Sequence, residues 1–479
     1  RRLIRSRLGT DQLPMNLEQR LGLRDRQGRE SAVNPLFLEE TLQMMLSRDV
    51  VSVDQNRYGD GRIHIDETKL AQVQVPDTIY TLLLSRLDQL PAAARSLLHT
   101  ASVIGREFEL ATLVAISPGL NRETAVPLLA ELVEIELVQQ LSTGLVSTYL
   151  FQHNLIHQVV YQSLTYARRQ ALHATIAELI IRQSGELLPT QYPVLAYHFS
   201  QTNQHQDGLK YALAAAKDAE AQHNYRGAAE FYRQAIHYLE ALGDEVDWQT
   251  AVSVSIALAK ILLRQGQFGQ ADLLATEAMN LCLKMNEMSQ TLDLNNLLAE
   301  IRLRQARYTE VPTLTSKVIN SLLPHTPQEA LAQAYLLWGQ SLYALSDWSA
   351  AAEKLAKAAT ISRSVGHPTI LLSVLTAQAE VQSQQQLAGV ALQPIETALS
   401  LLENESDPTL IGQTQLVRSR VQFRLGLADE ALKSAETAVA SLRSAGSNGL
   451  AHGLTHRAAV NNYLGKFDAA LADLQHGAK

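Results

Sequence analysis

The second half of the chain is patterned by large hydrophobic residues that recur about every 40 positions. Most of them follow a short break that carries Gly, Asn or Asp, and the apolar spacing after each is that of an amphipathic helix. The recurring residues are Tyr225, Phe268, Tyr308, Trp348, Leu387, Leu427 and Phe467. The pattern predicts an array of about seven helical hairpins over residues 206–479, in which each of these residues opens a second helix.

Small residues reinforce this pattern, because they recur seven positions apart within several second helices. The pairs are Ala228/Ala235, Ala271/Ala278, Ala351/Ala358 and Ala431/Ala438. One unit has the small–small–large–small spacing of a tetratricopeptide repeat, at Gly339, Ala351, Leu355 and Ala358, although the usual period of about 34 residues is shorter. Small side chains let two helices approach closely, so we expect the hairpins to stack into an α-solenoid.

The first half of the chain predicts smaller units of mixed structure. Pro14 and Pro35 stand at positions suited to helix starts, where the missing N–H of proline costs nothing. The stretches Val50–Val53 and Arg62–Ile65 flank a run of turn residues and predict a β-hairpin.

Residues Pro91–Phe151 have the proportions of a winged helix. Two helices precede a third over Glu123–Glu136, and two short strands surround Ser142-Thr143-Gly144. A winged helix suggests DNA binding, but the third helix carries four Glu and no Lys or Arg. Carboxylates repel phosphate, so the sequence argues against direct contact with nucleic acid.

The stretch Tyr149–Leu164 joins the two halves. It predicts a short strand that runs directly into an amphipathic helix. Phe151, Leu155, Val159 and Leu164 follow the rhythm of one buried helical face.

Composition supports a mainly α fold. Hydrophobic residues make up 46% of the chain and aromatic residues only 5%, which favours helices built from Ala and Leu. Residues 1–30 hold eight Arg against four acidic residues, so this segment carries +4 and the rest −11 of the net charge of −7. The basic start predicts either an acidic partner or nucleotide phosphate, or it is a surface cut from a larger domain.

The compartment and the extent of the chain also follow from composition. Cys282 is the single cysteine, which excludes an internal disulfide and fits a reducing compartment. No run of about 18 apolar residues occurs, so we expect no membrane span and a cytoplasmic protein. The chain begins at Arg1 rather than Met, and its last repeat has no polar capping helix, so we expect a fragment of a longer protein.

The residues give no pattern typical of catalysis. No G-x-x-x-x-G-K-[ST] motif occurs, so no phosphate-binding loop is encoded. His153 and His157 are one helical turn apart but have no third ligand nearby, so we expect no metal site. Glu39-Glu40 predicts a solvated first helical turn. We expect that this chain alone is not an enzyme and holds no cofactor.

Four blocks carry a family resemblance: VNPLFLEE (33–40), PDTIYTLLLSRLDQLPAAARSLLHTASVIGREF (76–108), YLFQHNLIHQVVYQSL (149–164) and RRQALHATIAELI (168–180), the last followed by LAYHFSQTNQ. Together they resemble the downstream half of the signal-transduction ATPases with numerous domains (STAND proteins). Such ATPases are fused to class III adenylate or guanylate cyclases or to protein kinases, and they continue into tetratricopeptide arrays.

The resemblance implies four segments. Residues 1–90 correspond to the end of an ATPase module, with a helical lid and a hairpin, and residues 91–165 to a winged helix. Residues 166–205 correspond to a helical linker and residues 206–479 to the repeats. The expected fold is therefore mainly α, with the lid, hairpin and winged helix followed by an α-solenoid.

Two nucleotide-proximal residues are implied by the same resemblance. The family's Gly-x-Pro motif near the adenine falls on Val33-Asn34-Pro35, so Pro35 matches and the Gly does not. The family's winged-helix His, which senses the ADP β-phosphate, falls on His153. ATP or ADP with Mg²⁺ is thus expected in the parent ATPase, which could form a nucleotide-dependent oligomer.

Three functions remain open at this point. The first is the regulatory and sensor segment of a switch ATPase, whose repeats bind a protein or peptide partner or inducer. The second is part of a LuxR-type transcription regulator with its DNA-binding domain outside this chain. The third is a protein-interaction scaffold. The sequence of the same gene on both sides of this segment would separate them: an upstream cyclase or kinase supports the first, and a terminal helix-turn-helix supports the second.

The repeats themselves predict a partner groove. Alignment on the small residues puts Arg264, Arg304 and Arg424 at one position late in the first helix, with Lys260 and Arg420 nearby. A stacked array would bring these cations to its inner wall, where they would pair with the carboxylates of an acidic peptide. The alternative is that Arg late in a helix only complements the helix dipole.

Overall fold

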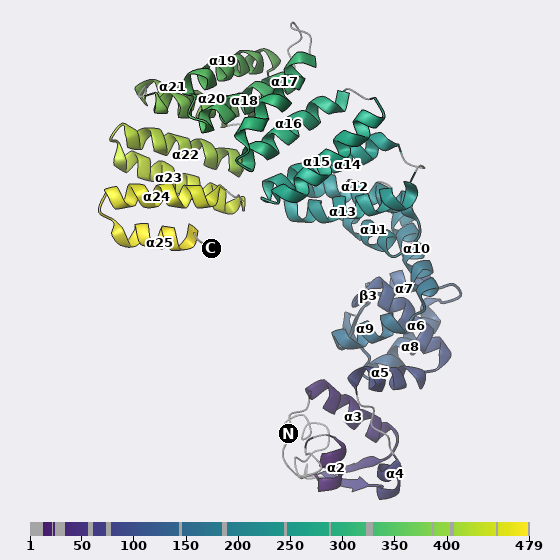
Figure 1. Ribbon diagram of the computed structural model, residues 1–479. Helices are drawn as coiled ribbons and strands as arrows, with labels where there is room; N and C mark the ends of the chain where they lie inside the picture. Colours follow the sequence, from purple (N-terminus) through teal and green to yellow (C-terminus); the bar gives the residue numbers. More distant parts are fainter. Residues whose placement is uncertain are drawn as a thin grey trace. The chain divides into compact units, whose positions relative to one another are not determined.

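The computed structural model describes residues 13–21, 23, 34–55, 61–72, 78–142, 146–183, 189–243, 247–286, 289–321, 329–366, 368–385, 388–402, 407–446 and 449–477. Most of the basic start, Val33, Thr143-Gly144 and Leu387 lie outside these residues. The chain divides into two compact units, residues 1–207 and 208–479 (Figure 1). The predicted mainly α fold is confirmed.

The first unit begins with helices packed beside a β-hairpin. Helix α2 spans Met15–Arg20 and α3 spans Pro35–Ser47, whose N-cap Asn34 accepts a hydrogen bond from the Leu36 N–H. Strands β1 (Val51–Gln55) and β2 (Gly61–Ile65) pair antiparallel, as predicted, and α4 (Glu67–Gln72) follows. Their shared core is built from the following buried residues: Leu17, Leu21, Leu38, Leu42, Met45, Val51, Leu70 and Leu82.

A second core has the element order of a winged helix. Helices α5 (Ile79–Asp88), α6 (Ala92–Ile104), α7 (Leu110–Ile116) and α8 (Arg122–Glu134) surround a three-stranded antiparallel sheet. The strands are β3 (Glu107–Glu109), β4 (Val138–Ser142) and β5 (Thr148–Phe151), in the order β3-β5-β4. The sequence predicted β4 and β5 but not β3, because three residues are too few for an alternating pattern to be recognised.

The predicted strand-to-helix joint is confirmed. Strand β5 leads into α9 (Asn154–Ser163), and Phe151, Val159 and Leu164 are buried. Leu155 is only partly buried, since Ile156 takes its place on the buried face. Burial of Phe151 alone contributes about 1.5–3 kcal/mol. Helix α10 (Tyr166–Gln183), the short η1 (Pro189–Gln191) and α11 (Tyr192–Ser200) complete this unit.

The second unit consists of stacked helical hairpins. Among the described residues the first helices are α12 (His205–Ala221), α14 (Trp248–Arg264), α16 (Ser289–Arg304), α18 (Glu329–Ala344), α20 (Pro368–Gln384), α22 (Pro408–Arg424) and α24 (Leu450–Tyr463). Their partners are α13 (Tyr225–Leu242), α15 (Phe268–Lys284), α17 (Val311–Ser321), α19 (Trp348–Val365), α21 (Ala388–Leu402), α23 (Ala428–Ser444) and α25 (Phe467–Gly477). Figure 1 draws these hairpins side by side, from teal to yellow.

The recurring hydrophobic residues mark the second helices as predicted, with two adjustments. Tyr225, Phe268, Trp348 and Phe467 are first residues of second helices, while Tyr308 opens a 3-10 turn, η3 (Tyr308–Glu310), that runs into α17. Leu427 is the N-cap and Ala428 the first residue of α23, so that prediction was one residue early. The small residues set the register of the helix, and in this repeat their spacing starts from Ala428 rather than from Leu427.

The small residues are the points of closest approach within each hairpin. All eight paired alanines of the second helices are buried. At Gly339 an added Cβ would lie 2.7 Å from Leu355 Cγ and 3.4 Å from the Ala351 carbonyl oxygen. Gly412 is equally crowded by Leu442, at 2.6 Å. Residues spaced like a tetratricopeptide unit therefore pack like one.

The turns inside the hairpins share one backbone conformation. In the turns that the structure describes, the second residue after the first helix has a left-handed φ of 58–79°. These residues are His223, Gly266, Ala306, Ser346, Gly426 and Gly465. The next N–H then donates to a carbonyl of the helix's last turn, as Gln267 does to Leu262 at 2.9 Å. This is the Schellman arrangement, which satisfies carbonyls at a helix end.

The first helices form the inner layer of the array. Helices α14, α16, α18, α20 and α22 each pack against the next first helix, whereas no two second helices form a packed pair in the described residues. A layer whose members touch one another lies on the inside of a curved stack. The described part of the chain has no helix long and apolar enough to cross a membrane.

Replacement of Gly339 by alanine tests the close approach. Gly339→Ala should lower the free energy of unfolding by about 1–3 kcal/mol, because the new methyl must displace Leu355. Gly269 in α15 has no atom within 4 Å of an added Cβ, so Gly269→Ala should be neutral or stabilise by up to about 1 kcal/mol. Urea unfolding followed by tryptophan fluorescence measures both, and equal effects would contradict the packing argument.

Candidate functional site

The inner layer is a half-buried wall. From Ala330 to Tyr343 on α18, Thr369 to Gln384 on α20 and Pro408 to Phe423 on α22, every residue is buried or partly buried. The first helices near the two ends of the array, such as α14 and α24, do carry exposed positions. A bound segment would therefore meet a partly dry surface in the middle of the array, where polar contacts are stronger than in open water.

Arg420 lies on this wall and Arg424 directly follows it, and both already have partners on α20. Arg420 Nη1 donates to Glu380 Oε1 of α20 at 2.8 Å. One turn later, Arg424 Nη1 donates to Ser383 Oγ of the same helix at 2.5 Å. These two contacts tie α22 to α20, so the cations join repeats as well as face the wall.

Arg264 has a more elaborate environment. Its Nη1 donates to the Tyr225 hydroxyl at 2.8 Å, and its guanidinium lies 5.0 Å from the centre of the Tyr225 ring. The same Nη1 is 3.6 Å from Asp407 Oδ2 at the start of α22. Arg304 pairs with Glu300 one turn earlier on α16, at 3.8 Å, while Lys260 is exposed on α14.

The five cations do not converge on one point. Arg264, Arg304 and Arg424 each end a first helix, as the alignment predicted, but Arg264 approaches the beginning of α22 while Arg424 stands at its end. Helix α22 has 17 residues, so its two ends are about 24 Å apart. The predicted groove site is thus a spaced series of cations, and its role in binding stays a prediction.

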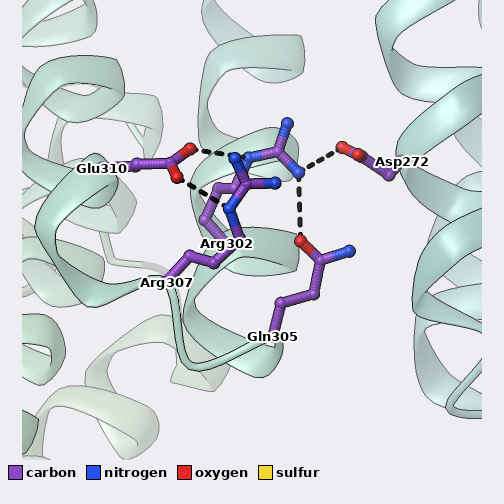
Figure 2. Close-up of polar contacts among 5 residues, drawn as sticks. All are labelled: Asp272, Arg302, Gln305, Arg307 and Glu310. Carbon is purple, nitrogen blue, oxygen red and sulfur yellow. Dashed lines mark hydrogen bonds and ion pairs between the residues drawn. The ribbon is translucent and has the colours of Figure 1, made fainter.

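A compensated charge network shows how the third hairpin is attached to the second. Figure 2 shows Arg302 of α16 between Asp272 of α15, at 2.5 Å, and Gln305, at 3.1 Å. Arg302 Nε also lies 3.2 Å from Glu310, whose other oxygen accepts from Arg307 at 2.7 Å. Two cations and two carboxylates balance, so this network holds η3 in place and leaves no net charge for a ligand.

The two nucleotide-proximal candidates lie on neighbouring elements of the first unit. Pro35 is the first residue of α3. His153 is the N-cap of α9, and its imidazole makes no capping bond and is 41% exposed. His153 Nε2 lies 4.0 Å from Glu39 Oε2, one turn beyond Pro35 on α3. Nothing in the structure tests whether a nucleotide would sit there, so both assignments remain predictions.

The expectation that Glu39-Glu40 form a solvated first turn is wrong, because both residues follow the first turn of α3 and Glu40 is buried. Its carboxylate is buried and pairs with Arg86 of α5, whose other nitrogen donates to the Ile135 carbonyl oxygen at 2.5 Å. This buried pair links α3 to the winged-helix core. A single sequence gave no signal for it, since the partners are 46 residues apart.

Two histidines from the blocks of family resemblance meet in the first unit. His173 of α10 and His198 of α11 are buried, with their Nδ1 atoms 2.9 Å apart. The Tyr161 hydroxyl lies 2.9 Å from His173 Nε2, and the Tyr197 ring packs edge-on against His173. Burial lowers the pKa of His173 to about 3, with His198 and Arg169 adding to the effect, and burial lowers the pKa of His198 to about 4. The pair is therefore neutral at pH 7.

Sequence reasoning missed the carboxylates that accompany the groove cations. The alignment that placed Lys260 and Arg420 at one position also places Glu300 and Glu380 there. Comparing every repeat at that position, instead of only the repeats with a cation there, would have predicted a wall that carries both cations and carboxylates. Asp407 had no such signal, because its approach to Arg264 depends on the curvature of the array.

No chemistry of a metal centre emerges. Within the described ranges, no group of three or more His, Cys, Asp or Glu side chains could hold a metal ion. His153 and His157 point to different partners, since His157 Nε2 lies 2.8 Å from the Ser102 carbonyl oxygen. Cys282 is buried in α15.

Comparison with known sequences gives one distant relative and no family. No family model matches the chain. An uncharacterized protein of Rhizobium meliloti (strain 1021) is 25% identical over 236 residues, which cover 48% of this chain and 21% of that protein. The match thus spans about a fifth of the relative's length.

Several solved structures share helical-repeat architecture with this chain. The apo quorum sensor NprR from B. thuringiensis is 12% identical, with a TM-score of 0.49 and coverage of 67% of this chain and 92% of that chain. A Rap protein complexed with competence and sporulation factor is 14% identical, with a TM-score of 0.47 and coverage of 65% and 92%. A STAND protein with a tetratricopeptide repeat sensor from Pyrococcus horikoshii is 11% identical, with a TM-score of 0.40 and coverage of 93% and 69%. The chain carries tetratricopeptide-type repeats on the evidence of its own hairpins.

The buried histidine pair makes the stability of the first unit depend on pH. Unfolding returns both imidazoles to a pKa near 6.5, so the unfolded chain binds more protons below that pH. The stabilisation is complete above pH 6.5 and is lost as the pH falls toward 4. We expect the free energy of unfolding of this unit to drop by about 2 kcal/mol or more between pH 7 and 5.

The double variant His173→Gln/His198→Gln removes the titrating groups and should flatten this pH dependence. His64→Gln, at an exposed histidine of β2, is the matched control and should leave it unchanged. The three tryptophans all lie in the repeats, at Trp248, Trp338 and Trp348. Tryptophan fluorescence therefore reports the unfolding of the array, and the additional change in circular dichroism reports the unfolding of the first unit. A double variant with the wild-type pH dependence would contradict the assignment.

Proposed function

We propose that the array of residues 208–479 binds an extended segment of a protein or peptide partner along its inner layer of first helices. The observation that carries this proposal is the continuous half-buried wall of α18, α20 and α22. Such a wall offers apolar area together with spaced polar groups, which is the composition of peptide-binding grooves. The Rap protein of the comparison was crystallised with competence and sporulation factor, which agrees with this use of a helical array.

The partner chemistry that we propose is an acidic peptide. Arg304 and Arg424 end two first helices and are exposed. Arg304 pairs with Glu300 and Arg424 donates to Ser383, with Glu380 near enough to interact electrostatically with Arg424. A carboxylate that replaces the contact to Ser383 would form a charge-assisted bond at the same distance, and such bonds are stronger than neutral ones.

We further propose that the chain is the regulatory and sensor segment of a multidomain signal-transduction ATPase of the STAND type. The support is the four resemblance blocks, together with the contact of His173 and His198, which joins the last of these blocks to the LAYHF segment that follows it. In this proposal the winged helix transmits the nucleotide state, ATP or ADP with Mg²⁺ binds in the parent, and this segment performs no catalysis. A cyclase or kinase would then be the output of the parent.

Peptide binding tests the first proposal. A fluorescein-labelled decapeptide with four Glu residues should bind more tightly than its Gln counterpart, about tenfold at 50 mM salt and less at 300 mM. Arg304→Gln/Arg424→Gln should remove most of this preference. Arg363→Gln/Arg443→Gln is the matched control, because these exposed arginines occupy the last turns of the second helices α19 and α23.

The control separates groove binding from helix-dipole effects. Both pairs of arginines stabilise the C-terminal ends of their own helices through the helix dipole, but only one pair belongs to the inner layer. Fluorescence anisotropy measures the affinities. If both double variants lose the Glu preference equally, or neither peptide binds in a salt-dependent way, the acidic-peptide groove is excluded.

His153 tests the second proposal in a longer protein that includes a nucleotide-binding core. An imidazole that donates to a β-phosphate oxygen contributes about 1.5–3 kcal/mol, so His153→Ala should speed ADP release roughly tenfold to a hundredfold. Folding should be nearly unchanged because the side chain is partly exposed and makes no cap bond. His64→Ala is the control. Wild-type ADP release in His153→Ala would leave a scaffold or another regulator as the better description.

A further inference from the structure

Arg264 connects two distant hairpins of the array. It ends α14 in the second hairpin, and it lies 3.6 Å from Asp407, the N-cap of α22 in the sixth hairpin. The two residues are 407 − 264 = 143 positions apart. Such a contact arises only because the curved stack brings the end of one first helix to the beginning of another.

No hydrophobic interface underlies this contact. The buried residues of α14 belong to a cluster that spans α12 to α16, whereas those of α22 belong to separate clusters with α20, α21, α23 and α24. In the described part of the chain α14 and α22 do not form a packed helix pair. Closure at this point therefore depends on charge rather than on buried apolar area.

Each partner is positioned by a contact of its own. Tyr225 holds Arg264 by a 2.8 Å hydrogen bond and by stacking, and Gln265 donates to the Tyr225 carbonyl oxygen at 3.2 Å. Asp407 Oδ1 accepts from the Thr409 N–H at 2.8 Å, which leaves Oδ2 facing Arg264. The guanidinium would thus stay in place if Asp407 moved away.

We propose that Asp407 is an internal carboxylate that closes the array on Arg264, and that a carboxylate of the acidic partner displaces it and opens the array. The displacement step rests on the proposed acidic-peptide binding, whereas the closure itself does not. Asp407 and the partner carboxylate present the same group to the same guanidinium, so they compete for one position.

The energetics suit a reversible closure. Arg264 is 53% exposed and Asp407 is 16% exposed, and 3.6 Å exceeds a normal hydrogen bond. Ion pairs of this kind shift an equilibrium by up to about fivefold. A contact of that strength biases the array toward the closed form and yields readily to a ligand that adds contacts elsewhere on the wall.

Asp407→Asn tests closure with little other change. Asn caps a helix as well as Asp does, so α22 keeps its start and loses only the charge. Asp347→Asn is the matched control, because the Asp347 carboxylate also caps its helix, α19, by accepting from the Ala350 N–H, and no ion pair joins it to a cation in the described residues. Both variants carry the same change in net charge.

Double electron–electron resonance measures the opening. Spin labels at Ser253→Cys in α14 and Lys433→Cys in α23, both exposed, are introduced with Cys282→Ala in the full chain. We expect longer and broader distances in Asp407→Asn and in 0.5 M salt, and wild-type distances in Asp347→Asn. Wild-type distances in Asp407→Asn would overturn the closure.

Affinity for the Glu-rich peptide tests displacement. Asp407→Asn should bind it about two- to fivefold more tightly, since the internal competitor is gone, and Arg264→Gln should bind it more weakly. If the peptide binds with wild-type affinity in Asp407→Asn, the displacement step is overturned and the proposed groove stands. If the distances lengthen but no peptide binds, the closure stands and the acidic-partner assignment fails.

Discussion

The close approach of two helices at small residues is the constraint on which the array depends. At Gly339 and Gly412 there is no room for even a methyl group, because Leu355 and Leu442 fill the space above each glycine. A hairpin held this tightly leaves its first helix able to touch the next first helix, and the curvature of the stack follows from those contacts. The half-buried inner wall is thus a consequence of packing within hairpins, between each first helix and its own partner helix.

Polar groups on that wall serve two purposes at once. Arg420, Arg424 and Arg264 are candidates for partner binding, yet each already bonds to a neighbouring repeat. A buried or half-buried cation needs a partner, so a wall without ligand must supply carboxylates or hydroxyls of its own. The network around Arg302 is the extreme case, where the charges balance completely and the contact is purely structural. In the proposed mode of binding, a partner would therefore exchange internal contacts for external ones.

The sequence predicted what depends on local pattern and missed what depends on curvature. The starts of α13, α15, α19 and α25, the buried alanines and the strand-to-helix joint were all visible as periodicity. The left-handed turn residues could be predicted only in part. Glycine marks the position at Gly266, Gly426 and Gly465, whereas Ala306 and Ser346 adopt a similar φ without a glycine to indicate it. Of the candidate site, the helix-end position of three arginines was predictable, whereas Glu40, Asp407 and the His173–His198 contact required the fold.

The two units differ in how charge is used, and this bears on regulation. In the first unit the buried groups are neutral or tightly paired: two histidines kept uncharged by burial, and Glu40 bound to Arg86. Such groups resist rearrangement because exposing or unpairing one costs the full desolvation penalty. In the array some pairs between repeats are partly exposed, such as Arg264 with Asp407, so exchanging one carboxylate for another there costs little. Under the proposed function, a ligand would therefore rearrange contacts more easily in the array than in the first unit, where His153 is partly exposed and makes no capping bond.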